Sequence, residues 1–354
     1  MNLQNYATYK EIMKQNNTWE NVYDDIIGKK LQHDEISVEN IDEIILFGCG
    51  SSYNLAQSAA FFTRSLREPQ KSALAIPSSE LLLNPDYYFK RDKKYLLVGF
   101  SRSGETTETV DVFRILTGRQ NIRFLGISCR ENSSICNIAK SYFVCRDAVE
   151  KSIVMTESFS SMLLAYILIL LKAAKRKNII EDFKKIISDI NIPEMEDYTQ
   201  RLIDEFDFSS YFVLGSGFNY GLSVEADLKM KEMSQVPSYS YHLYEFSHGP
   251  KSLLDINSLC LVLNPDNKLF KYEDIAMELR QLGAQIVTFG NKGTDGIQDR
   301  GIRSYSGKEA TNESANAFQC IPFFQLAALF KTIKKGLNPD MPKSLSYTVK
   351  KPKL

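Results

Sequence analysis

The sequence predicts an α/β protein made of two similar three-layer α/β/α domains with mostly parallel sheets. Two observations lead to this fold class. Short apolar runs alternate with segments of helical periodicity, a pattern typical of parallel strands whose connecting helices cover both faces of the sheet. A glycine turn near the start of the chain also recurs in its second half, which indicates an internal repeat.

Length and composition agree with a two-domain globular protein. The 354 residues, 44% of them hydrophobic, supply apolar side chains for more than one core. Lys and Arg together number 43, as do Asp and Glu, so no net charge favours non-specific binding to nucleic acid or to a membrane surface. We therefore expect neither nucleic acid nor a membrane as a partner.

The cysteines and the amino terminus favour a cytoplasmic location. The six cysteines include no Cys-x-x-Cys pair, which argues against a zinc ribbon or a redox-active dithiol. No basic segment followed by an apolar stretch opens the chain, so no secretory signal is expected. The most apolar segment, Met162–Leu171, is shorter than the roughly 20 residues of a membrane span and predicts a buried helix.

The first half of the chain begins with helical periodicity and continues as strand, turn and helix. Residues 1–27 predict a helical segment ahead of a first domain over 28–190. In that domain the apolar run Ile44–Phe47 predicts a strand, followed by a glycine turn at 48–52 and a helix over Tyr53–Arg67.

The same order continues through the rest of the first domain. Further strands are predicted at Tyr95–Phe100, Ile122–Ile127 and Tyr142–Cys145. The first of these ends in a serine-rich turn at 101–106 and leads into a helix over Val110–Leu116. Parallel strands would place the turn at 101–106 on the same sheet edge as the turn at 48–52.

The internal repeat indicates where the second domain lies in the sequence. Laying Leu214–Ser223 on Phe47–Ala56 aligns Gly48 with Gly215 and Gly50 with Gly217. The second domain is predicted over 191–330, joined near Asn191-Ile192-Pro193, with a carboxyl-terminal tail over 331–354. Its later strands are predicted at Leu259–Leu263 and Gln285–Phe289.

The two copies differ at their second turn. The first copy has Phe100-Ser101-Arg102-Ser103-Gly104, whereas the second has Leu263-Asn264-Pro265-Asp266-Asn267. If the serines hold a ligand, each chain carries one such site, in its first half.

The two serine turns are typical of a phosphate site. A strand that ends in small hydroxyl residues and enters a helix presents backbone N–H groups, a helix dipole and hydroxyl donors to one point. The alternative is that these hydroxyls only cap helices. Tyr53 interrupts the dinucleotide-binding glycine pattern and no P-loop motif is present, so a phosphorylated metabolite without a nucleotide is the expected ligand.

An acid/base pair is predicted in the second half. Of the three histidines, His33, His242 and His248, the last lies in a Ser-His-Gly-Pro loop. Glu225, Lys229 and Glu232 share one face of the helix after the repeated glycine turn. The plainer alternatives are a solvated ion-pair stripe and a loop histidine that hydrogen-bonds a backbone carbonyl.

Sugar phosphate chemistry would use both groups. Moving a proton between C1 and C2 of a sugar needs a carboxylate that reaches both carbons and an imidazole that opens the ring or shuttles the hydroxyl proton. The sequence lacks His-Glu-x-x-His and any His/Cys cluster with ligand spacing, so neither a metal nor another cofactor is expected.

At these motifs the sequence resembles the two-domain type of the SIS (sugar isomerase) family, which includes fructosamine-6-phosphate deglycases and the isomerase domain of glucosamine-6-phosphate synthase. Lys229-Met230-Lys231-Glu232 resembles the family's L-K-x-K-E helix, and Ser247-His248-Gly249-Pro250 resembles its K-H-G-P loop. The resemblance implies flavodoxin-like domains, Glu232 as the base and His248 as the ring-opening group. It also implies that His248 is contributed to a neighbouring subunit, hence a homodimer.

The resemblance further implies which residues bind the substrate. The sugar pocket is expected to include Ile153, Val154 and Lys229. The phosphate is expected to be bound by Gly50, Ser51, Ser52, Ser101, Arg102, Ser103 and Thr106.

Three positions depart from the synthase pattern. Arg102 stands where the synthase usually has glutamine, and Tyr347 stands where its closing segment has lysine, unless a register slip lets Lys343 replace it. Asn2 follows the initiator Met where the glutaminase domain has its nucleophilic cysteine, so glutamine-dependent amination is not expected.

Three functions are therefore open. The leading hypothesis is a metal-independent enzyme acting on a sugar 6-phosphate, either a fructosamine-6-phosphate deglycase or an amino-sugar-6-phosphate deaminase. The first alternative is a simple aldose–ketose phosphosugar isomerase. The second is a non-catalytic sugar-phosphate-binding regulator, which would need the serine turns but not Glu232 and His248.

Overall fold

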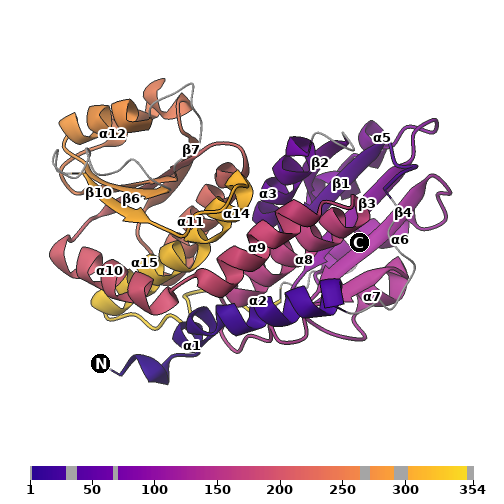
Figure 1. Cartoon of the computed structure of the whole chain (residues 1–354), viewed down its shortest axis with the longest axis horizontal. Helices are drawn as coiled ribbons and strands as arrows, with labels where there is room; N and C mark the ends of the chain where they lie inside the picture. Colours follow the sequence, from indigo (N-terminus) through magenta and orange to yellow (C-terminus); the bar gives the residue numbers. More distant parts are fainter. Residues whose placement is uncertain (1, 29–37, 67–70, 264–271, 291–301, 349–354) are drawn as a thin grey trace. The chain divides into compact units, whose positions relative to one another are not determined.

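The computed structural model describes residues 2–28, 38–66, 71–263, 272–290 and 302–348, and they form two compact units. The first unit comprises Lys14–Glu181 and Ser346–Leu354, and the second comprises Met1–Met13 and Asp182–Leu345. Each unit contains a five-stranded sheet (Figure 1). The predicted domain bounds, 1–27, 28–190, 191–330 and 331–354, stay predictions.

The sheet of the first unit is parallel throughout, with the order β2-β1-β3-β4-β5. Its strands are β1 (Glu43–Gly48), β2 (Ser72–Pro77), β3 (Tyr95–Ser101), β4 (Ile122–Ser128) and β5 (Tyr142–Val144). Four of the five were predicted, and β2 was not.

Helices cover both faces of this sheet. One face carries α3 and α8, with α2 packed on α8, and the other carries α4, α6 and α7. The helices of this unit are α2 (Gln15–Tyr23), a π-helical turn (Asp24–Gly28), α3 (Ser51–Ser65), α4 (Ser78–Leu83), α5 (Pro85–Tyr88), α6 (Thr107–Leu116), α7 (Ser134–Ala139) and α8 (Glu157–Ala173), while α9 (Lys177–Asp189) crosses the boundary between the units.

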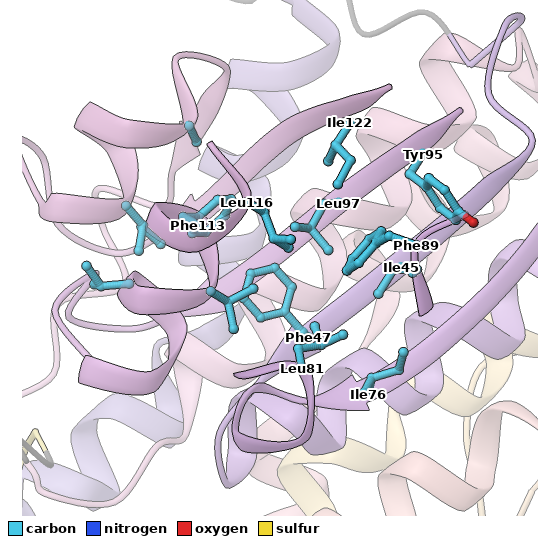
Figure 2. Close-up of a cluster of buried hydrophobic side chains, with 14 of the residues drawn as sticks. Ile45, Phe47, Ile76, Leu81, Phe89, Tyr95, Leu97, Phe113, Leu116 and Ile122 are labelled. Carbon is cyan, nitrogen blue, oxygen red and sulfur yellow. The ribbon is translucent and has the colours of Figure 1, made fainter. Parts of the chain in front are cut away.

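Successive side chains along the central strands point to opposite faces of the sheet, which explains why the core has two layers. Ile45 and Phe47 of β1 point toward α6, where the Phe47 ring lies 5.1 Å from that of Phe113 (Figure 2). The intervening residues Ile44 and Leu46 are also fully buried, so they pack on the opposite face. A strand with both faces covered is apolar along its whole length, which is why β1 is recognisable in the sequence.

The apolar segment 162–171 lies within α8, as predicted for a buried helix. Every residue of α8 from Glu157 to Leu171 is buried. None of the helices in the described residues is both long and apolar enough to span a membrane.

The second unit repeats the topology of the first. Its parallel sheet has the order β10-β9-β8-β6-β7, which becomes 5-4-3-1-2 when the strands are counted from β6. The strands are β6 (Ser210–Gly215), β7 (Ser238–His242), β8 (Ser258–Leu263), β9 (Gln285–Gly290) and β10 (Arg303–Ser306). The predicted fold class of two similar α/β/α domains is confirmed.

Helices also sandwich the second sheet. On one face α11 packs against α15, and α15 packs against α10 and α1. The other face carries α12 and η3. The helical segments are η1 (Leu3–Asn5), α1 (Ala7–Met13), α10 (Ile192–Glu205), α11 (Phe218–Ser234), η3 (Glu245–Ser247), η4 (Pro250–Leu253), α12 (Tyr272–Gln281), α14 (Glu313–Phe318) and α15 (Cys320–Lys334).

The repeated glycines adopt matching conformations. Gly50 has φ 54° and ψ −128°, and Gly217 has φ 63° and ψ −127°, a region that side-chain-bearing residues rarely enter. A Cβ on Gly48 would lie 2.7 Å from the Ser52 backbone, and one on Gly215 would lie 2.5 Å from the Asn219 carbonyl oxygen. Both turns therefore need glycine for the same steric reasons. Two sequence expectations, those for Asn264–Asn267 and His33, lie outside the described residues.

Helix α2 is held to α8 by buried polar contacts. The Trp19 indole N–H donates to Ser160 Oγ at 2.8 Å, and Thr18 Oγ1 donates to Glu157 Oε2 at 2.9 Å. Glu157 also pairs with Lys14, Nζ to Oε1, at 2.8 Å. Burial raises the pKa of Glu157 to about 7, against the opposing effect of Lys14.

Replacing Gly48 or Gly215 by alanine is expected to destabilise the fold. Each added methyl would meet backbone atoms that cannot rotate away, so the free energy of unfolding should fall by about 1–3 kcal/mol. Urea unfolding measures the change. Gly28→Ala is the control, because a Cβ there meets nothing within 4 Å. Equal losses in all three variants would contradict this steric explanation.

Glu157 should make stability depend on pH. Its folded pKa of about 7 lies above its ordinary 4.5, so the folded state keeps a proton that the unfolded state loses, and the stability from Glu157 declines as pH rises from 4.5 to 7. The unfolding free energy of wild type relative to Glu157→Gln should fall by about 2 kcal/mol between pH 5 and pH 8. A constant difference across that range would contradict the raised pKa.

Candidate functional site

The two predicted phosphate turns follow neighbouring strands of the first unit. The chain leaves β1 into α3 on one face of the sheet and leaves β3 into α6 on the other face. Between two such strands a crevice opens at the carboxyl edge, where open α/β sheets bind ligands. Both turns lie at this edge, Gly50-Ser51-Ser52 after β1 and 101–106 after β3.

The first turn places two serines at the start of α3. Gly50 is the N-cap residue, and Ser51 and Ser52 are the first two helical residues, with side chains 5% and 4% exposed. The N-cap residue is a glycine, which has no side chain to cap α3.

The second turn is held by its own hydroxyl groups. Ser101 Oγ lies 3.0 Å from Thr106 Oγ1 and accepts from the Gly104 N–H at 3.1 Å, while Ser103 Oγ accepts from the Glu105 N–H at 3.2 Å. Gly104 has φ +66°, and a Cβ there would lie 2.2 Å from Ser133 Oγ. Although Thr106 is the N-cap of α6, its side chain makes no capping hydrogen bond. The hydroxyls shape the turn and remain grouped at its centre.

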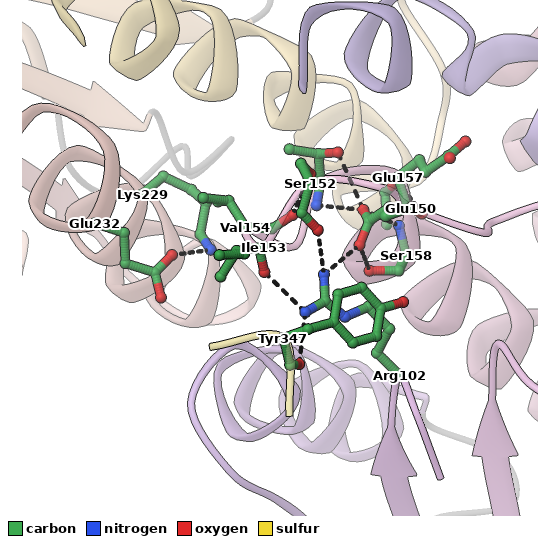
Figure 3. Close-up of polar contacts among 12 residues, drawn as sticks. Arg102, Glu150, Ser152, Ile153, Val154, Glu157, Ser158, Lys229, Glu232 and Tyr347 are labelled. Atoms are coloured by element: carbon green, nitrogen blue, oxygen red, sulfur yellow. Dashed lines mark hydrogen bonds and ion pairs between the residues drawn. The ribbon is translucent and has the colours of Figure 1, made fainter. Parts of the chain in front are cut away.

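The Arg102 side chain, also predicted to bind phosphate, extends to a different group of residues (Figure 3). Its Nη1 donates to Glu150 Oε2 at 2.8 Å, and its Nη2 donates to the Ile153 carbonyl at 2.8 Å. The same Nη2 donates to the Tyr347 carbonyl at 3.0 Å, and the guanidinium lies 3.8 Å from the Tyr347 ring centre. The main chain of Arg102 belongs to the serine turn, while its guanidinium binds the 150–153 segment and the carboxyl-terminal tail.

Glu150 anchors this group, a role that the sequence analysis did not identify. Its Oε1 accepts from the Thr156 and Ser158 N–H groups at 2.6 and 2.9 Å, and its Oε2 accepts from Ser158 Oγ at 2.6 Å. The residue is 3% exposed. No capping pattern in the sequence indicated it, because Glu150 lies six residues before the N-cap residue Thr156 of α8. Of the predicted pocket residues, Ile153 ends this segment and accepts from Arg102, and the next residue, Val154, is buried.

The predicted charged face on α11 forms a buried ion network rather than a solvated stripe. Lys229 and Glu225 are fully buried, with Nζ and Oε1 3.2 Å apart, and Lys229 also donates to Glu232 Oε2 (Figure 3). Burial lowers the pKa of Lys229, but Glu225 and Glu232 outweigh that effect and raise it above its usual value. The Glu232 side chain is 21% exposed, so the carboxylate of the predicted base is accessible to solvent.

His242 and His248 lie on the surface of the second unit. His248 is exposed and follows η3, where its N–H donates to the Glu245 carbonyl at 3.1 Å, and Gly249 after it has φ 122°. His242 ends β7 and stacks on Tyr220 with ring centres 3.7 Å apart. No pattern in the sequence indicates this stacking, because it joins the end of β7 to the first turn of α11.

A cavity of about 500 Å³ lies at the edge of the second sheet where strands β9 and β10 begin. It is lined by Tyr198 and Glu205 of α10 and by the first residues of two strands, Gln285 and Arg303. Because it contains none of the predicted residues, we do not assign the site to it. Within the described ranges, no group of three or more His, Cys, Asp or Glu side chains is arranged to hold a metal ion.

Comparisons with known proteins identify related sequences along most of the chain. The SIS domain family matches residues 37–172 and 207–322. The isomerizing glutamine–fructose-6-phosphate aminotransferase of Haemophilus influenzae is 26% identical over 345 residues, which cover 93% of this chain and 55% of the relative. The chain spans about half the length of the curated relatives it matches.

Solved structures match the whole of the fold. The glucosamine-6-phosphate deaminase of Thermotoga maritima has a TM-score of 0.78 and 29% identity, covering 97% of this chain and 99% of that one. The tagatose-6-phosphate ketose/aldose isomerase of Escherichia coli has a TM-score of 0.78 and 20% identity, covering 98% of each chain.

Removing the ammonium from the buried ion network should destabilise the second unit. Lys229→Met removes the counterion of two carboxylates, so the free energy of unfolding should fall by about 3 kcal/mol. Lys231→Met is the matched control on the same helix, because its ion pair with Asp227 is partly solvated. A loss no larger than that of the control would show that the network does not support the fold.

Proposed function

We propose that the chain, which belongs to the SIS domain family, is an enzyme that moves a proton between C1 and C2 of an amino-sugar 6-phosphate and then releases the amine. The observation that carries this proposal is the match to the Thermotoga maritima glucosamine-6-phosphate deaminase, which extends over 99% of that chain. A deglycase acting on fructosamine 6-phosphates is the closest variant, because it differs only in the direction of the proton transfer and in the amine.

The serine turns are the proposed phosphate site. Ser51, Ser52, Ser101, Ser103 and Thr106 gather hydroxyl groups at the carboxyl edge of β1 and β3. The amino ends of α3 and α6 add the positive ends of their dipoles, which favour a dianion.

Glu232 is the proposed base. It would take the proton from C2 of the open-chain amino sugar while the C1 carbonyl oxygen takes up a proton, and it would return its proton to C1 while the amino group loses one, which leaves an imine at C2. The resulting imine at C2 would add water, and cleavage of the C2–N bond would release ammonia and leave a ketose 6-phosphate. Lys229 supports this role because its ammonium donates to Glu232 Oε2 and so orients the carboxylate.

His248 is the proposed ring-opening group, working in the site of a neighbouring subunit within a homodimer. Its exposure and its place in a loop that ends in Gly249 and Pro250 support this role. The imidazole would shuttle the proton between the C1 hydroxyl and the ring oxygen.

Glu232→Gln tests the proposal. The amide cannot accept the C2 proton, so ammonia release from glucosamine 6-phosphate should fall by about 10³-fold, while calorimetric binding of the non-reactive 2-amino-2-deoxyglucitol 6-phosphate should persist. Glu20→Gln, an exposed glutamate on α2, is the control. Full turnover in Glu232→Gln would remove the assigned base.

The wild-type protein distinguishes the alternative functions in the same assays. Amine release from fructosamine 6-phosphates, but not from glucosamine 6-phosphate, would indicate the deglycase. Sugar interconversion without amine release would indicate a simple isomerase. Thermal stabilisation by sugar phosphates without any turnover would indicate a regulator.

A further inference from the structure

We infer that Arg102 is a positioning residue whose guanidinium holds the carboxyl-terminal tail through Tyr347. Ligand binding at the serine turn 101–106 and docking of the tail would then be coupled. The inference deepens the proposed function and rests on it for the identity of the ligand. It concerns Arg102 and Tyr347, two of the three positions at which the sequence departs from the synthase pattern. The structure places these two residues in direct contact.

Arg102 joins three segments that lie far apart in the sequence. Its main chain is part of the serine turn, and its guanidinium donates to Glu150 and to the carbonyls of Ile153 and Tyr347. The side chain is 6% exposed. A residue that is part of the turn and also binds the tail transmits a displacement of one to the other.

Glu150 fixes the direction of the guanidinium. Its carboxylate is held by the Thr156 and Ser158 N–H groups at the start of α8, so it does not follow Arg102 if Arg102 moves. Turning the guanidinium toward a ligand in the serine turn would leave a buried carboxylate without its cation, which is costly. The contacts of the side chain therefore favour the tail over the phosphate.

The tail is held by both its backbone and its ring. The Tyr347 carbonyl accepts from Arg102 Nη2 at 3.0 Å, and the ring centre lies 3.8 Å from the guanidinium carbon. The guanidinium of Arg130, at the end of β4, lies 5.4 Å from the same ring. Arginine suits this role because its planar fork binds carboxylate and carbonyl groups while its face stacks on an aromatic ring, whereas the lysine ammonium is a point charge.

The consequence is coupling between ligand binding and tail docking. A phosphate that orders the serine turn also orders the Arg102 main chain, which keeps the guanidinium in place for Tyr347. The docked tail in turn limits the motion of the turn. This is the kind of closure that retains substrate and excludes water during a reaction.

Limited trypsin cleavage after Lys343 tests the inference, because a protease needs the residues around its cleavage site to leave the surface. Tyr347→Ala removes the ring and leaves the Arg102–Glu150 pair intact, so cleavage should be about tenfold faster than in wild type. Tyr347→Phe keeps both the ring and the carbonyl and should be cleaved at the wild-type rate. Equal cleavage rates in Tyr347→Ala and wild type would overturn the inference.

Arg102→Lys separates a positioning role from phosphate binding. In this variant we expect faster tail cleavage, a KM for glucosamine 6-phosphate raised about tenfold and a kcat changed less than threefold. Adding Tyr347→Ala to Arg102→Lys should change the rate of tail cleavage little further. In wild type, inorganic phosphate or glucosamine 6-phosphate should slow the cleavage, and in Arg102→Lys it should not. Loss of phosphate binding with unchanged tail cleavage would show that Arg102 binds the phosphate directly, which overturns the inference.

The cleavage measurement does not depend on turnover. If wild type releases no amine from any sugar phosphate, the proposed function fails, yet the comparison of Tyr347→Ala with Tyr347→Phe still decides whether Arg102 and Tyr347 hold the tail. Circular dichroism of each variant establishes that it is folded before cleavage is compared.

Discussion

The adjacency of β1 and β3 is the constraint on which the first unit depends. Their helices leave toward opposite faces of the sheet, so the backbone separates at the carboxyl edge and the turns 50–52 and 101–106 face one crevice. The second unit has the same strand order, and Gly50 and Gly217 have nearly the same backbone angles. The resemblance to the SIS domain family, predicted from the motifs, is confirmed by its match over both units.

The sequence predicted the central strands and, of the four edge strands in the described sheets, only β5, whereas β2, β7 and β10 were missed. β1, β3, β6 and β8 are covered on both faces, so they are continuous apolar runs that stand out from their surroundings. β2, β7 and β10 lie at sheet edges and mix buried with exposed residues. Their sequences, such as Ser-Tyr-Ser-Tyr-His in β7, resemble ordinary surface segments, and only pairing with a neighbouring strand makes them part of the sheet.

Residues of the candidate site could be predicted where they lie close together along the sequence. The serine turns follow their strands directly, and Lys229 and Glu232 are close along one helix, so spacing alone relates them. Burial of Lys229 was not predictable, because it depends on what packs over α11. The contacts of Glu150 and Tyr347 with Arg102 were not predictable either, because they join residues that are distant in the sequence and only the folded unit brings them together.

The division of the chain between the units sets the order in which the protein can be completed during synthesis. The second unit begins with Met1–Met13 and resumes at Asp182, and its helix α1 packs on α15 near the end of the chain. After it emerges from the ribosome, α1 therefore waits until α15 has been translated, whereas most of the first unit can fold earlier. The segment of the first unit that includes Tyr347 is also translated after α15. A chain that stops before α15 would thus leave α1 without the helix on which it packs and Arg102 without its contact to Tyr347.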